Sequence, residues 1–253
     1  MKPGTWLPLL ALCCCLTAVA QGNDPVDPRI EAARINTRLA MEYLKLGHLE
    51  VARDKIERAL VQNPRDISVQ LGAGLVYERL LDTQRAEKHF RQALRTDSSH
   101  PEAQNALGAF LCRNGEWVRG EAMFVNAARN PLYRTPEVAY TNAGVCAHKA
   151  GRLEQAEEYL RQALAQRAIY PEALLQLASV SYERGSFLQA RAFVQRFLDV
   201  TPPTAEVLLL GHQVEKALGD QQSAADFADR LRQAFPESAQ LRALDGRDQR
   251  NPE

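Results

Sequence analysis

The sequence predicts an all-α fold, a right-handed superhelix built from six helix–turn–helix repeats. Small and large apolar residues recur at matching places in successive blocks of 34 residues, a period typical of paired-helix arrays. Glycine stands near the middle of most blocks, where a turn joins two helices, and proline or a capping residue opens several of them. The predicted repeats span residues 33–66, 67–100, 101–134, 137–170, 171–204 and 205–238.

The first three repeats carry the signature of the tetratricopeptide repeat. In repeat one the signature residues are Leu39, Ala40, Tyr43, Gly47, Ala52, Ile56, Ala59 and Pro64. In repeat two they are Ala73, Gly74, Tyr77, Ala86, Phe90 and Ala93. In repeat three they are Leu107, Gly108, Leu111, Gly115, Gly120, Phe124 and Ala127. Small residues at the eighth and twentieth positions of each repeat let its two helices approach closely, and larger apolar residues fill the space beside them.

After a slip of two residues at 135–136, three more repeats follow in register. In repeat four the matching residues are Ala143, Gly144, Ala147, Gly151, Ala156, Leu160 and Ala163. In repeat five they are Leu177, Ala178, Gly185, Ala190, Phe197 and Pro202. Repeat six has the fewest matches, namely Gly211, Gly219, Ala224, Leu231 and Pro236. Each repeat leaves an apolar face uncovered, so neighbouring repeats are expected to stack into a solenoid with a concave groove.

Several residues mark the first turns of the predicted helices. Pro101, Pro136 and Pro171 stand at or near the first helical position, where the missing N–H of proline costs nothing. Asp66 and Thr204 are expected to act as N-caps.

The segments outside the repeats differ from them in composition. Residues 1–20 read as a secretory signal peptide, because Lys2 precedes an apolar stretch that ends in a small-residue cleavage site, Ala18-Val19-Ala20. A membrane-anchoring N-terminus is the alternative. Residues 21–32 are polar and are expected to form a flexible leader. Residues 239–253 are expected to form a C-terminal cap and a disordered tail.

Composition and motifs argue against catalysis and against nucleic-acid binding. Lys and Arg number 31 and Asp and Glu number 31, so no basic excess would attract nucleic acid or an anionic membrane. The histidines have no metal-binding spacing; they are His48, His89, His100, His148 and His212. Phosphate-binding glycine loops and nucleophile motifs are absent from the sequence. We therefore expect a protein-binding module that is not an enzyme and has no cofactor, metal or small-molecule substrate.

Two cysteines lie within the predicted repeats. Cys112 and Cys146 fall in the first helices of repeats three and four. The axes of such neighbouring helices lie roughly 8–10 Å apart. At that separation, Cβ atoms that face each other can come close enough for a disulfide bond. An exported chain meets an oxidising compartment, which favours the disulfide. Two unpaired cysteines acting as small apolar residues are the alternative.

The predicted function lies in the concave groove. Positions 2, 5, 9, 12 and 13 of the first helix generally face that side of a tetratricopeptide array. They would place an apolar strip in the N-terminal half of the groove, formed by Met41, Leu44, Leu71 and Leu75 and rimmed by Lys45 and Arg79. Apolar side chains on a solvent-exposed surface indicate that a segment of a partner protein binds there. The alternative is that the leader 21–32 folds back over them.

Two stretches of the sequence point to a narrower family. They are NALGAFLCRNGEW at 105–117 and NPLYRTPEVAYTNAGVCAHKAGRLEQAEEYLRQAL at 130–164. The chain resembles the type IV pilus biogenesis and stability proteins, the PilW/PilF pilotin family, over residues 30–238. The resemblance implies a periplasmic adaptor that binds the outer-membrane secretin, or another pilus assembly protein, and promotes secretin localisation, multimerisation and pilus stability. It also implies that Cys112 and Cys146 are disulfide-bonded.

A general periplasmic interaction module, serving cytochrome maturation or cell-wall machinery, is the alternative function. Neighbouring genes discriminate between the two. A pilus operon favours the first, whereas haem-lyase genes favour the second.

We predict that the mature chain starts at Gln21 and carries no lipid. Members of the resembled family are commonly lipoproteins with a small residue before the acylated cysteine, whereas Leu12, Cys13 and Cys14 precede the three cysteines here. The cleavage site at Ala20 favours ordinary processing and a periplasmic protein. Mass spectrometry of the protein from its own envelope checks this. A diacylglyceryl mass on Cys13, Cys14 or Cys15 would contradict it and place the protein at the inner face of the outer membrane.

Overall fold

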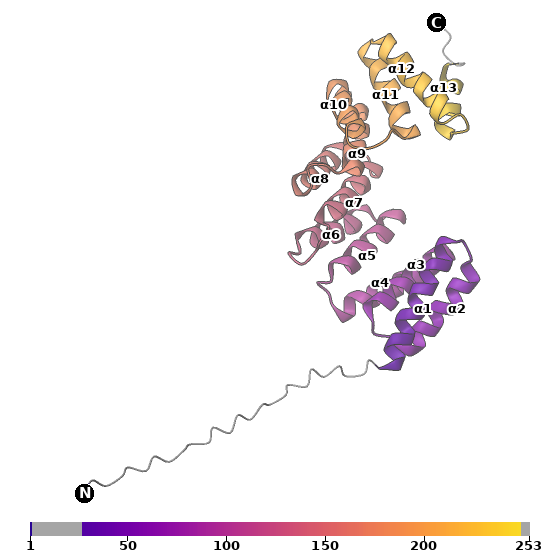
Figure 1. Cartoon of the computed structure of the whole chain (residues 1–253), viewed down its shortest axis with the longest axis vertical. Coiled ribbons are helices and arrows are strands. Elements are labelled where there is room, and N and C mark those ends of the chain that lie inside the picture. Colours follow the sequence, from indigo (N-terminus) through magenta and orange to yellow (C-terminus); the bar gives the residue numbers. More distant parts are fainter. Residues whose placement is uncertain (2–26, 249–253) are drawn as a thin grey trace.

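The protein is an elongated array of helices (Figure 1). The computed structural model describes Met1 and residues 27–248, and within them it holds thirteen α-helices and no strand. The helices are α1 (Pro28–Lys45), α2 (Leu49–Gln62), α3 (Ile67–Arg79), α4 (Thr83–Thr96), α5 (Pro101–Arg113), α6 (Trp117–Arg129), α7 (Pro136–Lys149), α8 (Leu153–Gln166), α9 (Pro171–Glu183), α10 (Phe187–Leu198), α11 (Ala205–Leu218), α12 (Gln221–Ala234) and α13 (Ala239–Asp248). The predicted all-α repeat solenoid is confirmed.

Within each repeat the two helices pack at the positions expected from the sequence. A Cβ atom built on Gly120 of α6 would lie 3.0 Å from the carbonyl oxygen of Gly108 in α5, so the two backbones are in direct contact. Large residues one turn after the twentieth position fill the space beside this approach. They are buried in the first four repeats, as Ile56, Phe90, Phe124 and Leu160.

The turn inside each repeat contains one residue in the left-handed region. Five of these residues are glycines with φ between 73° and 82°, namely Gly47, Gly115, Gly151, Gly185 and Gly219. The second repeat has Leu81 at the same place, with φ of 62°. Its side chain is 88% exposed, so it contributes nothing to the core that would offset the backbone cost. The packing of the helices on both sides therefore imposes the left-handed conformation, and glycine only lowers its backbone energy cost.

Helix starts follow the predicted signals, with one exception at the first helix. Asp66 and Thr204 accept hydrogen bonds from the amides of Val69 and Val207, at 3.0 and 3.3 Å, which confirms both N-caps. The flexible-leader prediction is wrong for residues 28–32, which form the first turns of α1. The Asp27 carboxylate caps that helix and Pro28 opens it, so the segment carries a complete start signal.

The two ends of the array differ. At the C-terminal end α13 packs on α11 and α12, and Leu244 is 2% exposed there. Residues 239–248 of the predicted cap and tail thus form a helix, while residues 249–253 lie outside the described part of the chain. At the N-terminal end α1 leaves Ile30, Ile35 and Leu39 exposed. Residues 2–20 of the predicted signal peptide also lie outside the described part.

The first helix of each pair (α1, α3, α5, α7, α9 and α11) is called an A helix here, and the second is called a B helix. Every A helix contacts the next A helix, whereas the backbones of successive B helices do not approach each other. The A helices therefore line the inner side of the curve, and the B helices fan apart outside it. None of the helices in the described ranges has the length and apolar character needed to cross a bilayer.

Candidate partner-binding surface on the A helices

Three of the predicted groove residues come together on α1 and α3. Leu75 is 37% exposed, and Met41 and Leu71 are half-buried. The side chain of Met41 reaches across to α3, because its methyl carbon lies 3.5 Å from where a Cβ on Gly72 would stand. Leu71 and Leu75 are four residues apart and so share one face of α3. We call Met41, Leu71 and Leu75 the A-helix strip.

The fourth apolar residue, Leu44, does not belong to this surface. It is 8% exposed and packs in the core that extends from α1 to α5. On α1 the buried residues Ala33, Thr37, Ala40 and Leu44 follow a helical spacing and form a single stripe. Leu44 extends that stripe, so the prediction that it faces a partner is wrong.

Two basic residues border the A-helix strip, and they differ in their contacts. Lys45 Nζ lies 2.9 Å from a carboxylate oxygen of Glu42 on the same helix, and both side chains are exposed. The side chain of Arg79, at the end of α3, is exposed and forms no hydrogen bond or ion pair with any residue in the described ranges. Its guanidinium is therefore available to a carboxylate from outside the chain.

Farther along the A helices, polar side chains pair across neighbouring repeats. Arg113 of α5 donates two hydrogen bonds to the carboxylate of Glu78 in α3, at 2.7 and 2.8 Å. His148 Nε2 of α7 lies 2.9 Å from an oxygen of Glu183 in α9. These pairs join position 12 of one repeat to position 13 of the next, so the 34-residue register of the sequence is the signal that could have predicted them.

Asn142 of α7 donates a hydrogen bond of 3.0 Å to the side chain of Asn105 in α5. Several polar groups of repeats two to five are thus engaged with each other. The A-helix strip and Arg79 differ from them in lying open at the N-terminal end of the same face.

The two cysteines are joined by a disulfide bond in the structure, with a Cα–Cα distance of 5.8 Å. Cys146 is fully buried and Cys112 is 7% exposed, and they pack with Phe124 and Ala143 in a small cluster. The bond links α5 to α7. Its formation in the exported protein stays a prediction.

The structure excludes part of the leader as the alternative occupant of the groove. Residues 28–32 lie in α1 itself, upstream of Met41 on the same helix, and cannot fold back over it. Residues 21–26 lie outside the described part of the chain. Among the described residues, no three His, Cys, Asp or Glu side chains gather in a way that could hold a metal ion.

Comparison with known proteins assigns these helices to a repeat family. Two models of the tetratricopeptide repeat match the chain, one over residues 147–211 and the other over residues 37–80 and 71–133. The type IV pilus assembly protein PilF of Pseudomonas aeruginosa is 25% identical over 225 residues, which cover 88% of this chain and 89% of that protein.

Solved structures agree with this similarity over most of the array. The crystal structure of PilW, a widely conserved type IV pilus biogenesis factor, is 33% identical with a TM-score of 0.76, and the match covers 85% of this chain and 98% of PilW. A structure of Pseudomonas aeruginosa PilF is 24% identical with a TM-score of 0.72, and covers 87% of this chain and 99% of that one.

Proposed function

Because the chain belongs to the tetratricopeptide family of type IV pilus biogenesis proteins that includes PilW and PilF, we propose that it is a periplasmic adaptor that binds the outer-membrane secretin. In this role it promotes the localisation and multimerisation of the secretin and stabilises assembled pili. The observation that carries the proposal is the A-helix strip, an apolar surface on the inner side of the array where Leu75 is exposed and Met41 and Leu71 are half-buried.

The chemistry of this surface favours a peptide-like segment over a small molecule. Met41, Leu71 and Leu75 offer apolar contact spread over two neighbouring helices. Arg79 adds one unpaired guanidinium at the edge, which can orient a carboxylate of the partner. An amphipathic or extended segment of the secretin fits such a combination of apolar anchors and a charged rim.

We predict that the double variant Leu71→Glu, Leu75→Glu abolishes secretin capture and surface piliation. Replacing an apolar anchor with a charged residue weakens the binding free energy by at least about 1–2 kcal/mol per residue. Apolar burial is lost, and the new charge is buried without a partner. The measurement is the amount of secretin retained from envelope extract by the purified protein, identified by mass spectrometry. Helical circular dichroism should stay unchanged.

Leu188→Glu is the matched control, because Leu188 lies on α10 away from the A-helix strip and is 71% exposed. It should capture secretin like the unmodified protein. Arg79→Ala should weaken capture less than the double variant, and mainly at low salt, where exposed charges are least screened. Normal secretin capture by the double variant would place the binding surface elsewhere. Capture of a haem-lyase or cell-wall protein instead would favour a general periplasmic module.

A further inference from the structure

A pocket of about 430 Å³ opens between repeats two and three and is lined by α4, α5 and α6. Leu107 and Leu111, one turn apart on α5, are buried and form its floor. Leu94 of α4 and Met123 of α6 are half-buried at its sides. The pocket exists because α4 and α6 both pack against α5 but their backbones do not approach each other. Leu94, Ala122 and Met123 keep part of its apolar lining exposed to water.

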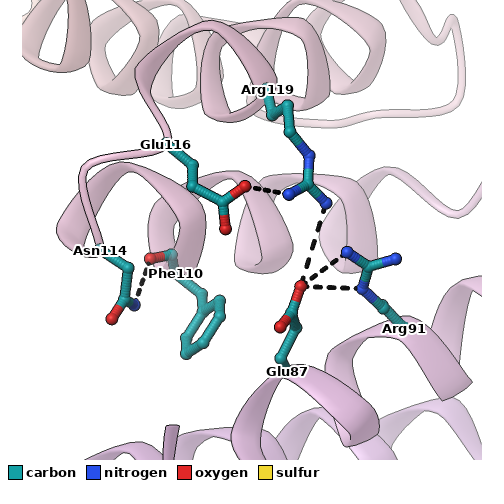
Figure 2. Close-up of polar contacts among 6 residues, drawn as sticks. All are labelled: Glu87, Arg91, Phe110, Asn114, Glu116 and Arg119. Carbon is teal, nitrogen blue, oxygen red and sulfur yellow. Dashed lines mark hydrogen bonds and ion pairs between the residues drawn. The ribbon is translucent and has the colours of Figure 1, made fainter. Parts of the chain in front are cut away.

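Three guanidinium groups surround this α5 pocket, those of Arg91, Arg95 and Arg119. Figure 2 shows two of them converging on Glu87. Arg91 donates two hydrogen bonds to one Glu87 oxygen, at 2.9 and 2.6 Å, and Arg119 lies 3.9 Å from the same oxygen. Arg119 also pairs with Glu116. Two carboxylates therefore serve these two arginines.

The third arginine has no carboxylate partner among the described residues. Arg95 donates two hydrogen bonds to the side-chain oxygen of Gln92, at 2.9 and 2.5 Å, and that amide is uncharged. A guanidinium has five N–H donors, so Arg95 keeps several for an external acceptor. It is exposed at the mouth of the pocket.

The helix that carries this arginine is strongly basic. Along α4 there are four basic residues, Arg85, Lys88, Arg91 and Arg95, against one acidic residue, Glu87. The chain as a whole is neutral, with 31 basic and 31 acidic residues. At the pocket itself the lining contains Arg91, Arg95 and Arg119 and no acidic residue, so its mouth attracts an acidic partner.

We propose that the α5 pocket docks an extended segment of a partner protein in which an apolar side chain is flanked by carboxylates. The apolar side chain contacts Leu94 and Met123 above the buried floor, and a carboxylate binds Arg95. The pocket volume lies within the range of about 300–1,000 Å³ found for ligand sites, and Arg and Met are enriched at protein interfaces. This site is separate from the A-helix strip, so the array would hold two partner segments at once.

The chain contains three methionines, Met1, Met41 and Met123, and two of them report on the two surfaces. Methyl signals of the full chain labelled with [methyl-13C]methionine should be recorded during titration with the blocked pentapeptide Glu-Leu-Leu-Asp-Glu. A saturable shift of the Met123 signal, without a shift of the Met41 signal, is expected. Peptides in which lysine replaces the acids, or serine replaces the leucines, should leave Met123 unshifted.

Arg95→Ala should weaken binding of this peptide roughly tenfold, because a charge-assisted hydrogen bond is lost. The control Arg58→Ala removes another exposed arginine, on α2, and should not change the affinity. Both side chains are exposed, so both variants should keep their helical circular dichroism.

No Met123 shift up to millimolar peptide, or an equal response to the lysine peptide, would overturn the proposal. A Met123 shift with sodium laurate but not with the peptide would assign the pocket to a fatty acid and overturn it as well. Since Met41 reports on the A-helix strip independently, none of these results bears on secretin binding there.

Discussion

Replacing Cys112 with serine should lower the free energy of unfolding of the oxidised protein by about 3–4 kcal/mol. The disulfide closes a loop with a sequence separation of 34 residues, and on the chain-entropy model that constraint on the unfolded chain accounts for this value. The effect should be large because of where the bond lies. One apolar core extends from α1 to α5 and another extends from α7 to α13, with the small Cys112–Cys146 cluster between them.

Urea denaturation followed by circular dichroism measures this loss. Cys146→Ser should be destabilised to the same extent, and the unmodified protein should fall to a similar stability once reduced. The reduced protein is the stricter control, since it introduces no hydroxyl into the buried site. Thiol titration of the unfolded, unreduced exported protein should detect no free thiol. Two thiols per chain would exclude the bond, and equal midpoints with and without reductant would exclude its stabilising role.

Gly120→Val should cost about 3 kcal/mol of unfolding free energy. A Cβ atom at this position would lie 3.0 Å from the carbonyl oxygen of Gly108 and 3.1 Å from the amide nitrogen of Cys112. Both are backbone atoms of α5, so no side-chain rotation can relieve the contact and the helices must separate. Separation would also disturb the disulfide cluster, because Cys112 is itself part of α5 and lies against Gly120.

Gly246→Val is the matched control for this change. Gly246 also lies in a helix, α13, and a Cβ there would meet no atom within 4 Å. Because valine and glycine have similar helix propensities, its stability should change by less than about 0.5 kcal/mol. Thermal or urea unfolding of the two variants checks the comparison. If they were equally destabilised, the close approach of α5 and α6 would not explain the loss.

The repeat pattern predicted the helix pairs because each position has a steric task that only a few residue types perform. Gly108 and Gly120 illustrate this, since their spacing alone identified the close approach of two helices. Leu81 illustrates the opposite case. Its sequence gives no sign of a left-handed turn, yet packing of α3 against α4 imposes one. Where packing fixes the two flanking helices, it overrides the backbone preference of the residue in the turn between them.

The candidate site was predicted less completely, because exposure depends on contacts between repeats. Leu44 and Met41 are close in sequence and both apolar, but the first extends the buried stripe of α1 while the second lies at its edge. The sequence did contain the start signal Asp27–Pro28, which we interpreted as part of a polar leader. The α5 pocket depends on how far α4 and α6 diverge, which no residue pattern within one repeat specifies.

The unequal ends of the array have a thermodynamic consequence. In a one-dimensional stack, a repeat with a single neighbour has only one interface to keep it folded. Within residues 27–248, repeat six has two neighbours, repeat five and α13, whereas repeat one packs on repeat two alone and leaves Ile30, Ile35 and Leu39 exposed. In this described part of the chain, fraying is therefore expected to start at α1, the helix that carries Met41. A partner that binds only the folded form of this repeat stabilises the least cooperative part of the molecule, so that binding and local folding are coupled there.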